Sequence, residues 1–366
     1  MNLLITGGAG FIGSTFVRMA LAKGHSVTVL DRLTYAGHRE NLEELLLSGA
    51  VRLVVGSIAD ANVVSSLLLG TTRWDAVVNF AAESHVDRSI SGPSPFIETN
   101  ILGTFQLLEA SLKYWRTLEP EARSRFRYLQ VSTDEVYGEL GPTGKFSEKT
   151  PYQPNSPYSA SKAAADHLVR AWHHTYGLPV LTTNCSNNYG PRQLPEKLIP
   201  LMIANAVAGK PLPVYGTGLN VRDWIHVADH CAGILLALER GTPGDTYCFG
   251  GNAERTNLDV VHGLCDTLDR LKPRATGSYR DLIAFVTDRP GHDFRYAIDD
   301  TLACEKLGFT RSYDFTRGLR NTIEWYLDNQ LWVHTILEKT KLLRETEKLR
   351  SFYQTTGVPG VQGVQA

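Results

Sequence analysis

Two adjacent carboxylic acids follow an apolar segment of the chain. Asp134 and Glu135 come after the run 128–131, which is expected to form a buried strand, and after the hydroxyls of Ser132 and Thr133. Repulsion between neighbouring carboxylates raises the pKa of one of them, so one acid can donate a proton while the other accepts one. Both can serve one reaction only if the strand has ended by Asp134, because adjacent strand residues point to opposite faces. As an alternative, Asp134 caps the next element.

A glycine-rich turn lies at the start of the chain. In "LLITGGAGFIG", Gly7, Gly10 and Gly13 stand between a predicted strand and a predicted helix, where a backbone can approach a pyrophosphate at the helix N-terminus. Asp31 follows about twenty residues on, at the end of the second predicted strand, where an acid accepts from a ribose 2′-hydroxyl. Its carboxylate favours NAD over NADP, although Arg32 can tolerate a 2′-phosphate. The alternative for Asp31 is a polar strand end.

A tyrosine and a lysine stand four residues apart in "SPYSASK". Tyr158 and Lys162 are expected to project from one face at the start of a helix. A phenol titrates near 10, so its use as a base near neutrality needs a shift of roughly three units, about 4 kcal/mol. The Lys162 ammonium and an oxidised nicotinamide can supply that shift, and Thr133 can bond the same reacting oxygen. Alone, the pair would be read as a surface feature of an amphipathic helix; together with the glycine turn it indicates catalysis.

These residues need a parallel sheet to position them. Short, continuously apolar or β-branched runs predict strands at 3–5, 27–30, 53–55, 76–78, 128–131 and 180–183, as in a sheet covered on both faces. Helical patterns lie between them at 11–23, 39–47, 61–69 and 100–114. The alternation predicts an α/β, Rossmann-like, doubly wound fold.

The pattern changes after residue 186. Prolines and glycines are frequent over 190–218 and cannot continue the same repeat, so a smaller domain is expected to begin there. We expect an NAD-binding domain at 1–186, with a return segment at about 223–248 whose residues 227–238 are helical. A substrate-binding domain is expected at 187–222 and 249–325, and a C-terminal helix and tail at 326–366. In that last part, 337–353 has a helical pattern and the final "TTGVPGVQGVQA" is expected to be disordered.

The composition excludes several functions. The net charge of −1 over 366 residues gives no basic field for nucleic acid or an anionic membrane surface. No apolar run reaches the roughly 20 residues of a membrane span, and the N-terminus does not have the pattern of a signal peptide. The five cysteines are scattered without a CxxC pair, so buried thiols are expected rather than disulfides or a metal site. A cytoplasmic protein with a small-molecule substrate is the expectation.

Several motifs together resemble a known family. "TGGAGFIG", "YSASK" and "NNYGP" are similar to the extended short-chain dehydrogenase/reductase superfamily. Within it, "STDEVYG", "NFAAESHVDRSI", "LDRLTYAG", "NNYGPRQLPEKLIP", "PVYGTGLNVRDWIHV" and "RPGHDFRYAID" resemble the dTDP-glucose 4,6-dehydratase family, through about residue 325. The resemblance implies a lyase in which NAD oxidises sugar C4, water leaves across C5 and C6, and hydride returns to C6. It implies Tyr158 as the base for the C4 hydroxyl, Glu135 as the C5 base and Asp134 as the acid at C6.

The resemblance also implies a set of binding residues. Thr133 and Lys162 complete the catalytic group. For NAD, which is expected to be tightly retained, the implied residues are Gly7, Gly10, Phe11, Ile12, Gly13, Asp31, Arg32, Leu33, Thr34, Tyr35, Ser57, Ile58, Phe80, Ala81, Ala82, Ser84, Thr99, Tyr158, Lys162 and Asn188. For the sugar nucleotide they are Ser84, Thr133, Glu135, Asn187, Lys197, Leu198, Pro213, Tyr215, Arg222, Asn257, Asp288 and His292. A homodimer built from helices near 100–115 and 158–176 is implied as well.

Some of these positions have other readings. Ser57 and Phe294 stand where the family usually has an acid and a basic residue, respectively. A guanidinium at Arg222 suits a diphosphate, but it can equally form a surface ion pair with Asp223. Tyr215 can stack on a pyrimidine or simply pack, and His292 can bind phosphate or cap its turn.

Two other functions fit parts of the sequence. A UDP-sugar 4-epimerase-like enzyme shares the glycine turn and the Tyr158–Lys162 pair, but it needs no acid–base pair for C5 and C6. A non-catalytic NAD-binding protein would be expected to lack Tyr158 or Lys162. Thymine and uracil nucleotides differ by one methyl group and one ribose hydroxyl, about 1–3 kcal/mol of discrimination, so the base stays open at this point.

Overall fold

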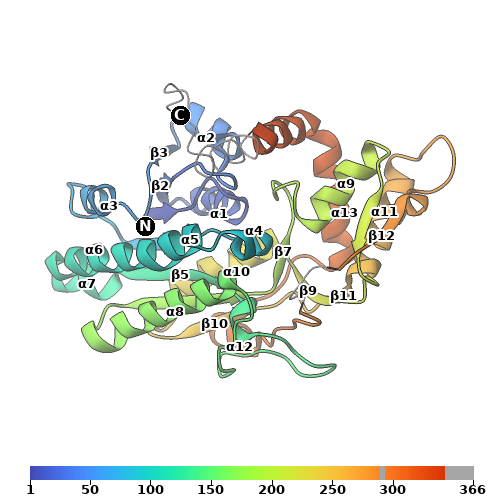
Figure 1. Cartoon of the computed structure of the whole chain (residues 1–366). Helices are drawn as coiled ribbons and strands as arrows, with labels where there is room; N and C mark the ends of the chain where they lie inside the picture. Colours follow the sequence, from blue (N-terminus) through green and yellow to red (C-terminus); the bar gives the residue numbers. More distant parts are fainter. Residues whose placement is uncertain (289–292, 343–366) are drawn as a thin grey trace, which may run out of the picture.

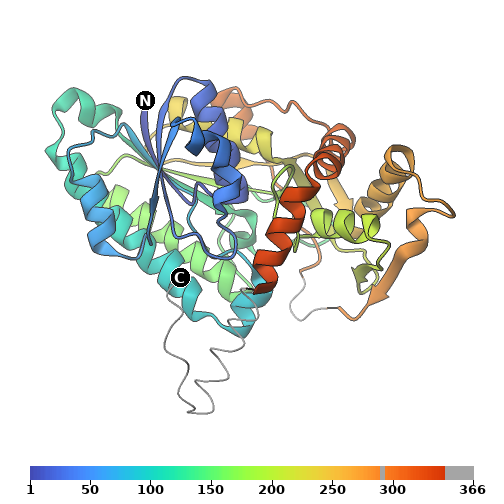
Figure 2. The same cartoon turned by 90° about the horizontal axis from the view of Figure 1, so that it is seen from above.

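A seven-stranded parallel sheet forms the larger part of the molecule. The computed structural model describes residues 1–288 and 293–342. Its main sheet has the order β10-β6-β5-β4-β1-β2-β3, and every neighbouring pair is parallel (Figures 1 and 2). The six predicted strands are confirmed as β1 (Asn2–Thr6), β2 (Ser26–Asp31), β3 (Val51–Val55), β4 (Ala76–Asn79), β5 (Arg127–Thr133) and β6 (Val180–Cys185). The doubly wound α/β fold is therefore confirmed.

Helices cover both faces of this sheet, which explains the continuous apolar strands. Leu3 and Ile5 contribute to one hydrophobic core, and Leu4, between them, contributes to the other. On the first face lie α1 (Phe11–Ala22), α10 (Val227–Arg240) and α12 (Thr301–Leu307). On the second lie α3 (Ala61–Leu68), α6 (Thr104–Thr117) and α8 (Pro157–Tyr176). Both faces are buried, as expected for a parallel sheet.

Shorter segments connect these elements. The predicted helix at 39–47 consists of a 3₁₀ turn, η1 (Arg39–Leu42), and α2 (Glu43–Leu47). The predicted helix at 100–114 begins within a π-helical segment, η2 (Ile97–Gly103). The remaining segments of this part are α4 (Val86–Ser91), α5 (Ser94–Phe96), α7 (Pro120–Arg125) and the 3₁₀ turn η3 (Asp134–Tyr137).

The smaller part begins after β6 and has two small sheets. One consists of β7 (Asn187–Tyr189), β9 (Val221–His226) and β11 (Glu254–Thr256), and the other pairs β8 (Leu212–Tyr215) with β12 (Ile283–Val286). Around them lie α9 (Leu198–Val207), α11 (Asn257–Leu271), η4 (Tyr279–Leu282) and α13 (Phe315–Asp328), whose apolar side chains form a separate core. Figure 1 shows this part beside the carboxyl ends of the main strands.

The chain crosses between the two parts more often than the sequence predicts. The return to the main sheet begins with α10 and β10 (Thr246–Phe249), whereas 223–226 belong to β9 and pair with the smaller part. A second return lies inside the stretch 249–325, because Ala303, Leu307 and Phe309 pack in the same core as α1 and α10. These positions differ from the predicted segments 223–248 and 249–325, and the division into domains stays a prediction.

The C-terminal residues pack against the N-terminal part. Residues 330–342 are helical, so this helix starts earlier than the predicted 337; the rest of 337–353 and the predicted disordered tail lie outside the described residues. Trp332 Nε1 donates to Asn41 Oδ1 at 3.0 Å, and Ile336 is 0% exposed against Tyr35 and Leu194. Figure 2 shows the C-terminal helices between the two parts.

The described residues include no helix with the length and apolar character that a membrane crossing requires.

The five cysteines, all within the described residues, are unpaired, and Cys185, Cys231, Cys248 and Cys265 are buried. This agrees with the expectation of buried thiols.

Candidate active site

The glycine turn packs too tightly for side chains. Gly7 has φ 70°, and a Cβ there would lie 2.6 Å from the backbone N of Ala81. A Cβ at Gly13 would lie 2.2 Å from the Gly7 carbonyl oxygen, so the first turn of α1 rests directly on the end of β1. Gly10 is the N-cap residue of α1 and brings the free N–H groups of the helix to the pocket. The turn fits a pyrophosphate, which these N–H groups and the helix dipole attract.

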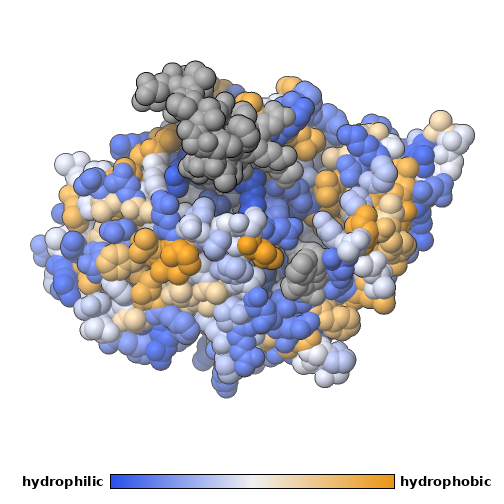
Figure 3. Space-filling model, in the orientation of Figure 1, coloured by the Kyte–Doolittle hydropathy of each residue, from blue (hydrophilic) through white to orange (hydrophobic). Residues whose placement is uncertain are grey.

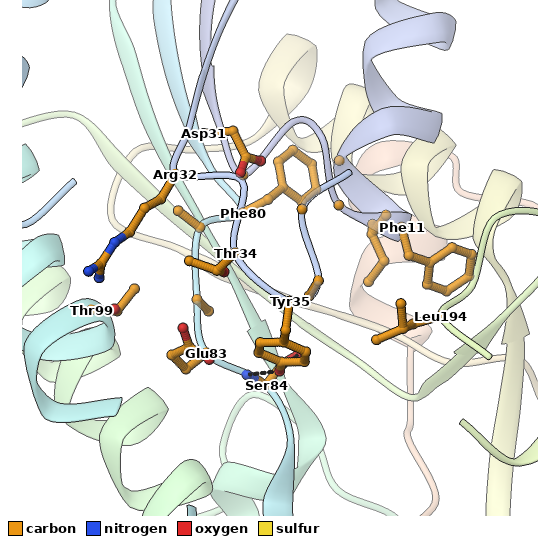
Figure 4. A pocket seen from close by; sticks show the side chains of 18 of the residues that line it. Phe11, Asp31, Arg32, Thr34, Tyr35, Phe80, Glu83, Ser84, Thr99 and Leu194 are labelled. Carbon is orange, nitrogen blue, oxygen red and sulfur yellow. Dashed lines mark hydrogen bonds between the residues drawn. The ribbon is translucent and has the colours of Figure 1, made fainter. Parts of the chain in front are cut away.

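A single pocket gathers most of the residues predicted for the cofactor (Figure 4). Its walls are the turns that follow β1, β2, β3 and β4, together with the start of α8 and the segment 192–197. The predicted residues that line it are Gly7, Gly10, Phe11, Ile12, Gly13, Asp31, Arg32, Thr34, Tyr35, Ser57, Ile58, Phe80, Ala81, Ala82, Ser84, Thr99, Tyr158 and Lys162. These residues fit a dinucleotide with its pyrophosphate at α1 and a ribose at Asp31.

Two predicted cofactor residues do not line this pocket. Leu33 packs its side chain against the main core, and its backbone N donates to Asp31 Oδ1 at 2.8 Å. The Asn188 amide is used within the protein: Oδ1 lies 2.9 Å from His230 Nδ1, and Nδ2 donates to the Ser186 carbonyl at 3.0 Å. Both side chains are therefore held by neighbouring protein groups.

Asp31 holds neighbouring backbone in place and also lines the pocket. It is 8% exposed, and its second oxygen accepts from Ala9 N at 2.9 Å, which ties the end of β2 to the glycine turn. Burial raises its pKa, and the backbone hydrogen bonds from Leu33 and Ala9 oppose that rise. The neighbouring Arg32 extends away from Asp31 toward Thr99 in Figure 4, with its guanidinium 3.9 Å from Glu98. A nearby acid makes Arg32 a poorer partner for a 2′-phosphate.

The acid pair lies where the chain turns. Strand β5 ends at Thr133 and η3 begins at Asp134, which meets the condition for both acids to reach one side. Thr133, not Asp134, is the N-cap residue, because its hydroxyl accepts from Glu135 N at 3.3 Å. The alternative that Asp134 is a cap is therefore wrong.

Asp134 is buried in a way that favours its protonated form. It is 2% exposed, Oδ1 accepts from the Thr133 hydroxyl at 3.3 Å, and Oδ2 has no hydrogen-bond partner among the described residues. Burial, followed by the charges of Glu135 and Asp223, raises the pKa of Asp134 well above its usual value. Glu135 is only half-buried. The pair thus contains a buried acid that keeps its proton and a more accessible neighbour.

Tyr158 and Lys162 both reach the pocket from the first turns of α8. Tyr158 is 8% exposed; burial and then the Glu135 charge raise the pKa of its phenol, while a hydrogen bond with the Thr133 hydroxyl lowers it. Lys162 Nζ donates to the Val131 carbonyl at 2.8 Å. In the chain by itself the pKa of Tyr158 is therefore raised, contrary to the expected lowering by Lys162, because the ammonium bonds the strand instead of the phenol.

Most of the predicted substrate residues lie in the smaller part. Of them, Ser84 and Lys197 line the pocket, and Lys197 Nζ donates to the Ser84 carbonyl at 3.4 Å. Thr133 and Glu135 lie at the end of β5, and the others are Asn187 on β7, Leu198 at the start of α9, Pro213 and Tyr215 on β8, Arg222 on β9, Asn257 at the start of α11 and the exposed Asp288. His292 lies outside the described residues. Tyr215 is 46% exposed and so presents its ring to solvent.

Arg222 is buried rather than paired at the surface. It is 5% exposed, and its guanidinium donates to the carbonyls of Val221 at 2.7 Å and Asp293 at 2.8 Å. The guanidinium also lies 4.3 Å from the centre of the Tyr296 ring. Asp223, in contrast, accepts from two backbone N–H groups of the turn before β11. The surface ion pair between Arg222 and Asp223 is not formed.

Sequence reasoning missed part of the pocket wall. His38, Glu83, Arg192, Gln193, Leu194 and Glu196 also line the pocket. Figure 4 shows Leu194 and Phe11 on one side, and Tyr35, whose hydroxyl accepts from Ser84 N at 3.3 Å, facing them. The signal was present in "GPRQLPEK", a turn-rich segment with four polar side chains directly before Leu198.

The fold and the pocket define a class of enzyme. A doubly wound sheet with a glycine turn, an acid after β2 and a Tyr158–Lys162 pair facing one pocket is the arrangement of an NAD-dependent short-chain dehydrogenase/reductase. The profile of the family described as "GDP-mannose 4,6 dehydratase" matches residues 4–322.

Relatives and solved structures narrow this class. A dTDP-glucose 4,6-dehydratase of Xanthomonas campestris pv. campestris is 58% identical over 336 residues, 92% of this chain and 95% of the relative. That of Salmonella typhimurium is 50% identical, over 92% and 95% of the two chains. The crystal structure of DesIV, the dTDP-glucose 4,6-dehydratase of Streptomyces venezuelae, with NAD bound, is 46% identical, covers 92% of this chain and 100% of that one, and gives a TM-score of 0.83. The chain belongs to the dTDP-glucose 4,6-dehydratase family of the extended short-chain dehydrogenase/reductase superfamily.

An epimerase has a similar fold. The UDP-glucose 4-epimerase of Thermus thermophilus in complex with NAD is 28% identical, covers 90% of this chain and 100% of that chain, and gives a TM-score of 0.79. The cofactor fold is thus common to both kinds of enzyme, and the choice between them depends on the residues beside the sugar.

Proposed function

We propose that this chain converts dTDP-glucose to dTDP-4-keto-6-deoxyglucose with NAD as its cofactor. Relatives that are 58% and 50% identical over 92% of this chain carry this activity in their names. The observation that carries the proposal is the acid pair: Asp134 is buried with a raised pKa, Glu135 is half-buried beside it, and Tyr158 lies in electrostatic contact with both. An epimerase needs only Tyr158 and Lys162 at this place, whereas an elimination also needs one acid and one base.

The first proton transfer belongs to Tyr158. NAD, when bound, takes hydride from C4 of the sugar and returns it to C6. Tyr158 accepts the proton of the C4 hydroxyl, and Thr133, already hydrogen-bonded to the phenol, can hold the same oxygen. Lys162 is buried at 4% exposure beside the pocket, where its ammonium favours the ionised phenol once both face the bound ligands.

The elimination belongs to the acid pair. A C4 ketone makes the neighbouring C5 proton acidic, and the Glu135 carboxylate removes it. Asp134 gives its proton to the C6 hydroxyl, which leaves as water. Burial and the Glu135 charge keep Asp134 in the protonated form that this step needs.

The diphosphate of the substrate needs cations at the mouth of the pocket. Lys197 lines the pocket, and Arg222 lies close enough to Asp134 for its charge to act on that carboxyl. Both therefore lie within reach of a ligand that spans from the sugar to the smaller part. A buried guanidinium suits a diphosphate bidentately, and its carbonyl partners hold it in place.

We place the protein in the cytoplasm as a homodimer. The outer faces of η2, α6 and α8 expose large apolar side chains: Ile97 at 45%, Leu102 at 51%, Phe105 at 36% and Tyr176 at 43%. Figure 3 shows hydrophobic surface gathered over α5 and α6. A second copy would cover such a patch and remove it from water. Light scattering is expected to give twice the chain mass, and a monomer would contradict the dimer.

The function is tested by parallel incubation with dTDP-glucose and UDP-glucose. The 4-keto-6-deoxy product has a characteristic absorbance in alkali, which neither substrate nor a 4-epimer shares. We expect this product from dTDP-glucose, at a higher rate than from UDP-glucose. A 4-epimer as the product would assign the chain to the epimerases instead, and no product from either nucleotide would favour a binding protein.

A further inference from the structure

Three ionisable side chains share one buried face of α8. Tyr158, Lys162 and Asp166 follow each other at four-residue intervals and are 8%, 4% and 4% exposed. The first two belong to the pocket wall. Asp166 lies about 12 Å from Tyr158 along the helix axis, and the function proposed above gives it no role.

Asp166 is tied to the strand that carries the reacting groups. Its Oδ2 accepts from the Ser132 hydroxyl at 2.6 Å and from the Tyr152 hydroxyl at 3.1 Å. Ser132 precedes Thr133 on β5. The other oxygen, Oδ1, is buried and has no hydrogen-bond partner among the described residues. The carboxylate is therefore held from one side only.

Lys162 is bound to the same strand, one residue earlier. Its Nζ donates to the Val131 carbonyl, and the ammonium and the Asp166 carboxylate act on each other through space, without a direct ion pair among the described residues. Burial disfavours the lysine charge, and Asp166 is the first of the groups that favour it, followed by Cys185. A buried ammonium bonded to one neutral carbonyl needs such a counter-charge to stay protonated.

The surroundings of Asp166 leave it ionised at neutral pH. Burial raises its pKa to about 6, while Lys162, the hydroxyls of Ser132 and Tyr152, and His167 oppose that rise. Tyr128 and Tyr137 also face it, and the Asp166 charge raises the pKa of each. The hydroxyls can donate to the carboxylate, and Lys162 and His167 lower its pKa, so the groups that act most strongly on Asp166 include no second carboxylate.

We propose that Asp166 is a positioning residue for the proton transfer at Tyr158, acting through Lys162 as its buried counter-ion. The proposal rests on the function inferred above, because it takes Tyr158 as the base. The Asp166 carboxylate keeps Lys162 an ammonium, and the ammonium in turn favours the phenolate of Tyr158. Loss of the carboxylate lets Lys162 give up its proton at a lower pH, so the phenol needs a higher pH to ionise.

The test is the pH profile of Asp166→Asn. Asparagine has the same shape and keeps an oxygen for Ser132 and Tyr152, but it carries no charge. In the plot of kcat against pH, we expect the rising limb to shift to higher pH by about one unit. At neutral pH, kcat therefore falls about tenfold, with little change in KM. Activity should approach that of the wild type at high pH, with NAD content and Tm retained. An unmoved limb would overturn the proposal.

Two further variants separate charge from structure. Ser132→Ala keeps the carboxylate but removes a hydrogen bond that favours its ionised form, so the limb should move the same way by a smaller amount. This variant carries the test if Asp166→Asn does not fold, and an unmoved limb in it then counts against the proposal. Asp229→Asn is the control: Asp229 is also buried, at 2% exposure, and accepts from the Ser312 and Tyr313 backbone N–H groups, but it lies on α10.

The outcomes distinguish this proposal from the proposed function. Asp229→Asn should lower Tm and leave the pH limb where it is. If Asp166→Asn loses activity equally at every pH, together with NAD, its role is structural and the proposal is wrong. If the wild type forms no 4-keto-6-deoxy product, the proposed function fails first, before any variant is compared.

Discussion

The cofactor half and the substrate half of the site are built in different ways. The cofactor half follows one edge of the parallel sheet, and four successive strands each end in a turn that lines it. The proposed substrate half would draw Asn187, Arg222 and Asn257 from β7, β9 and α11 of the smaller part, where neighbouring side chains such as Tyr215 are exposed. The first half is set by close backbone packing, and the second by longer side chains on separate segments.

Because the two halves are built differently, substitutions in them should affect different properties of the enzyme. Changes in the cofactor half should act on cofactor retention and stability, because its turns are fixed by contacts that leave no space for a Cβ. Changes at the junction of the two halves, where β5 ends, should act on turnover and leave the fold intact. Each variant below tests whether one half can be altered without the other.

The largest effect is expected at the junction, for Tyr158→Phe. The ring keeps its packing, including its edge-to-face contact with Phe96, whose ring centre lies 6.3 Å from that of Tyr158. The base for the C4 hydroxyl is lost. Removal of a general base lowers the rate by about 10²–10⁴-fold, and here no product should form at a measurable rate. The measurement is product formation with NAD content checked in parallel. Normal turnover would remove Tyr158 as the base.

Glu135→Gln should stop the reaction one step later. The amide has the shape of the carboxylate but cannot take the C5 proton, so the overall rate should fall by about 10²–10⁴-fold. Oxidation at C4 should remain measurable in a single turnover, because Tyr158 is untouched. Deuterium that still enters C5 at the wild-type rate would show that another residue is the base.

Ile336→Ala, on the C-terminal helix, should destabilise the cofactor half of the site. Ile336 is fully buried between the C-terminal helix and the pocket residues Tyr35 and Leu194. Its truncation should cost about 2–5 kcal/mol of the free energy of unfolding and speed the release of NAD. The control is Leu331→Ala on the same helix, at 80% exposure, which should change neither. Equal NAD release in the two variants would show that the helix does not support the pocket.

Gly13→Ala should disturb the pyrophosphate turn. Its Cβ would meet the Gly7 carbonyl oxygen at 2.2 Å, and that oxygen belongs to a backbone that cannot move without shifting β1. Overpacking of this kind costs about 1–3 kcal/mol, and the purified variant should contain less NAD. Gly141→Ala is the control, since nothing lies within 4 Å of a Cβ there. Full NAD content in Gly13→Ala would contradict the tight turn.

The smallest effect is expected for Glu98→Gln, beside Arg32. The Arg32–Glu98 pair is long, at 3.9 Å, and both side chains are 54% exposed. Exposed pairs contribute about 0–1 kcal/mol, so the ratio of Kd for NADP to Kd for NAD should fall by less than about tenfold. Binding titrations at low salt measure it, with the exposed Glu119→Gln as control. A rise in the ratio would show that Glu98 does not hold Arg32 away from a 2′-phosphate.

The sequence predicts the main sheet well because its strands are buried on both faces. Runs such as 76–78 are apolar without alternation, a pattern that is typical of a parallel strand covered on both faces. The sequence does not predict strand β10, because Thr246–Phe249 is short and lies between Gly244 and Gly250. The sequence does not predict the return of 301–309 either, because two buried side chains on a short helix and one just after it do not indicate which of the two cores receives them.

The site is predicted to a similar degree, and for a related reason. The glycine turn, Asp31 and the Tyr158–Lys162 pair have fixed spacings, so local sequence identifies them and the structure brings them to one pocket. Leu33 and Asn188 fail as pocket residues because neighbouring groups hold them, namely the core and His230. Which of two adjacent acids keeps its proton depends on burial and on the charges of residues distant in the sequence, such as Asp223.

Turnover of dTDP-glucose in deuterated water tests the central claim most directly. Nuclear magnetic resonance of the product shows where solvent deuterium enters and where the original C4 hydrogen goes. We predict a 4-keto-6-deoxy sugar with deuterium at C5 and with the former C4 hydrogen at C6. A product that keeps its C6 hydroxyl and its C5 hydrogen would contradict the assignment of Asp134 and Glu135 to an elimination.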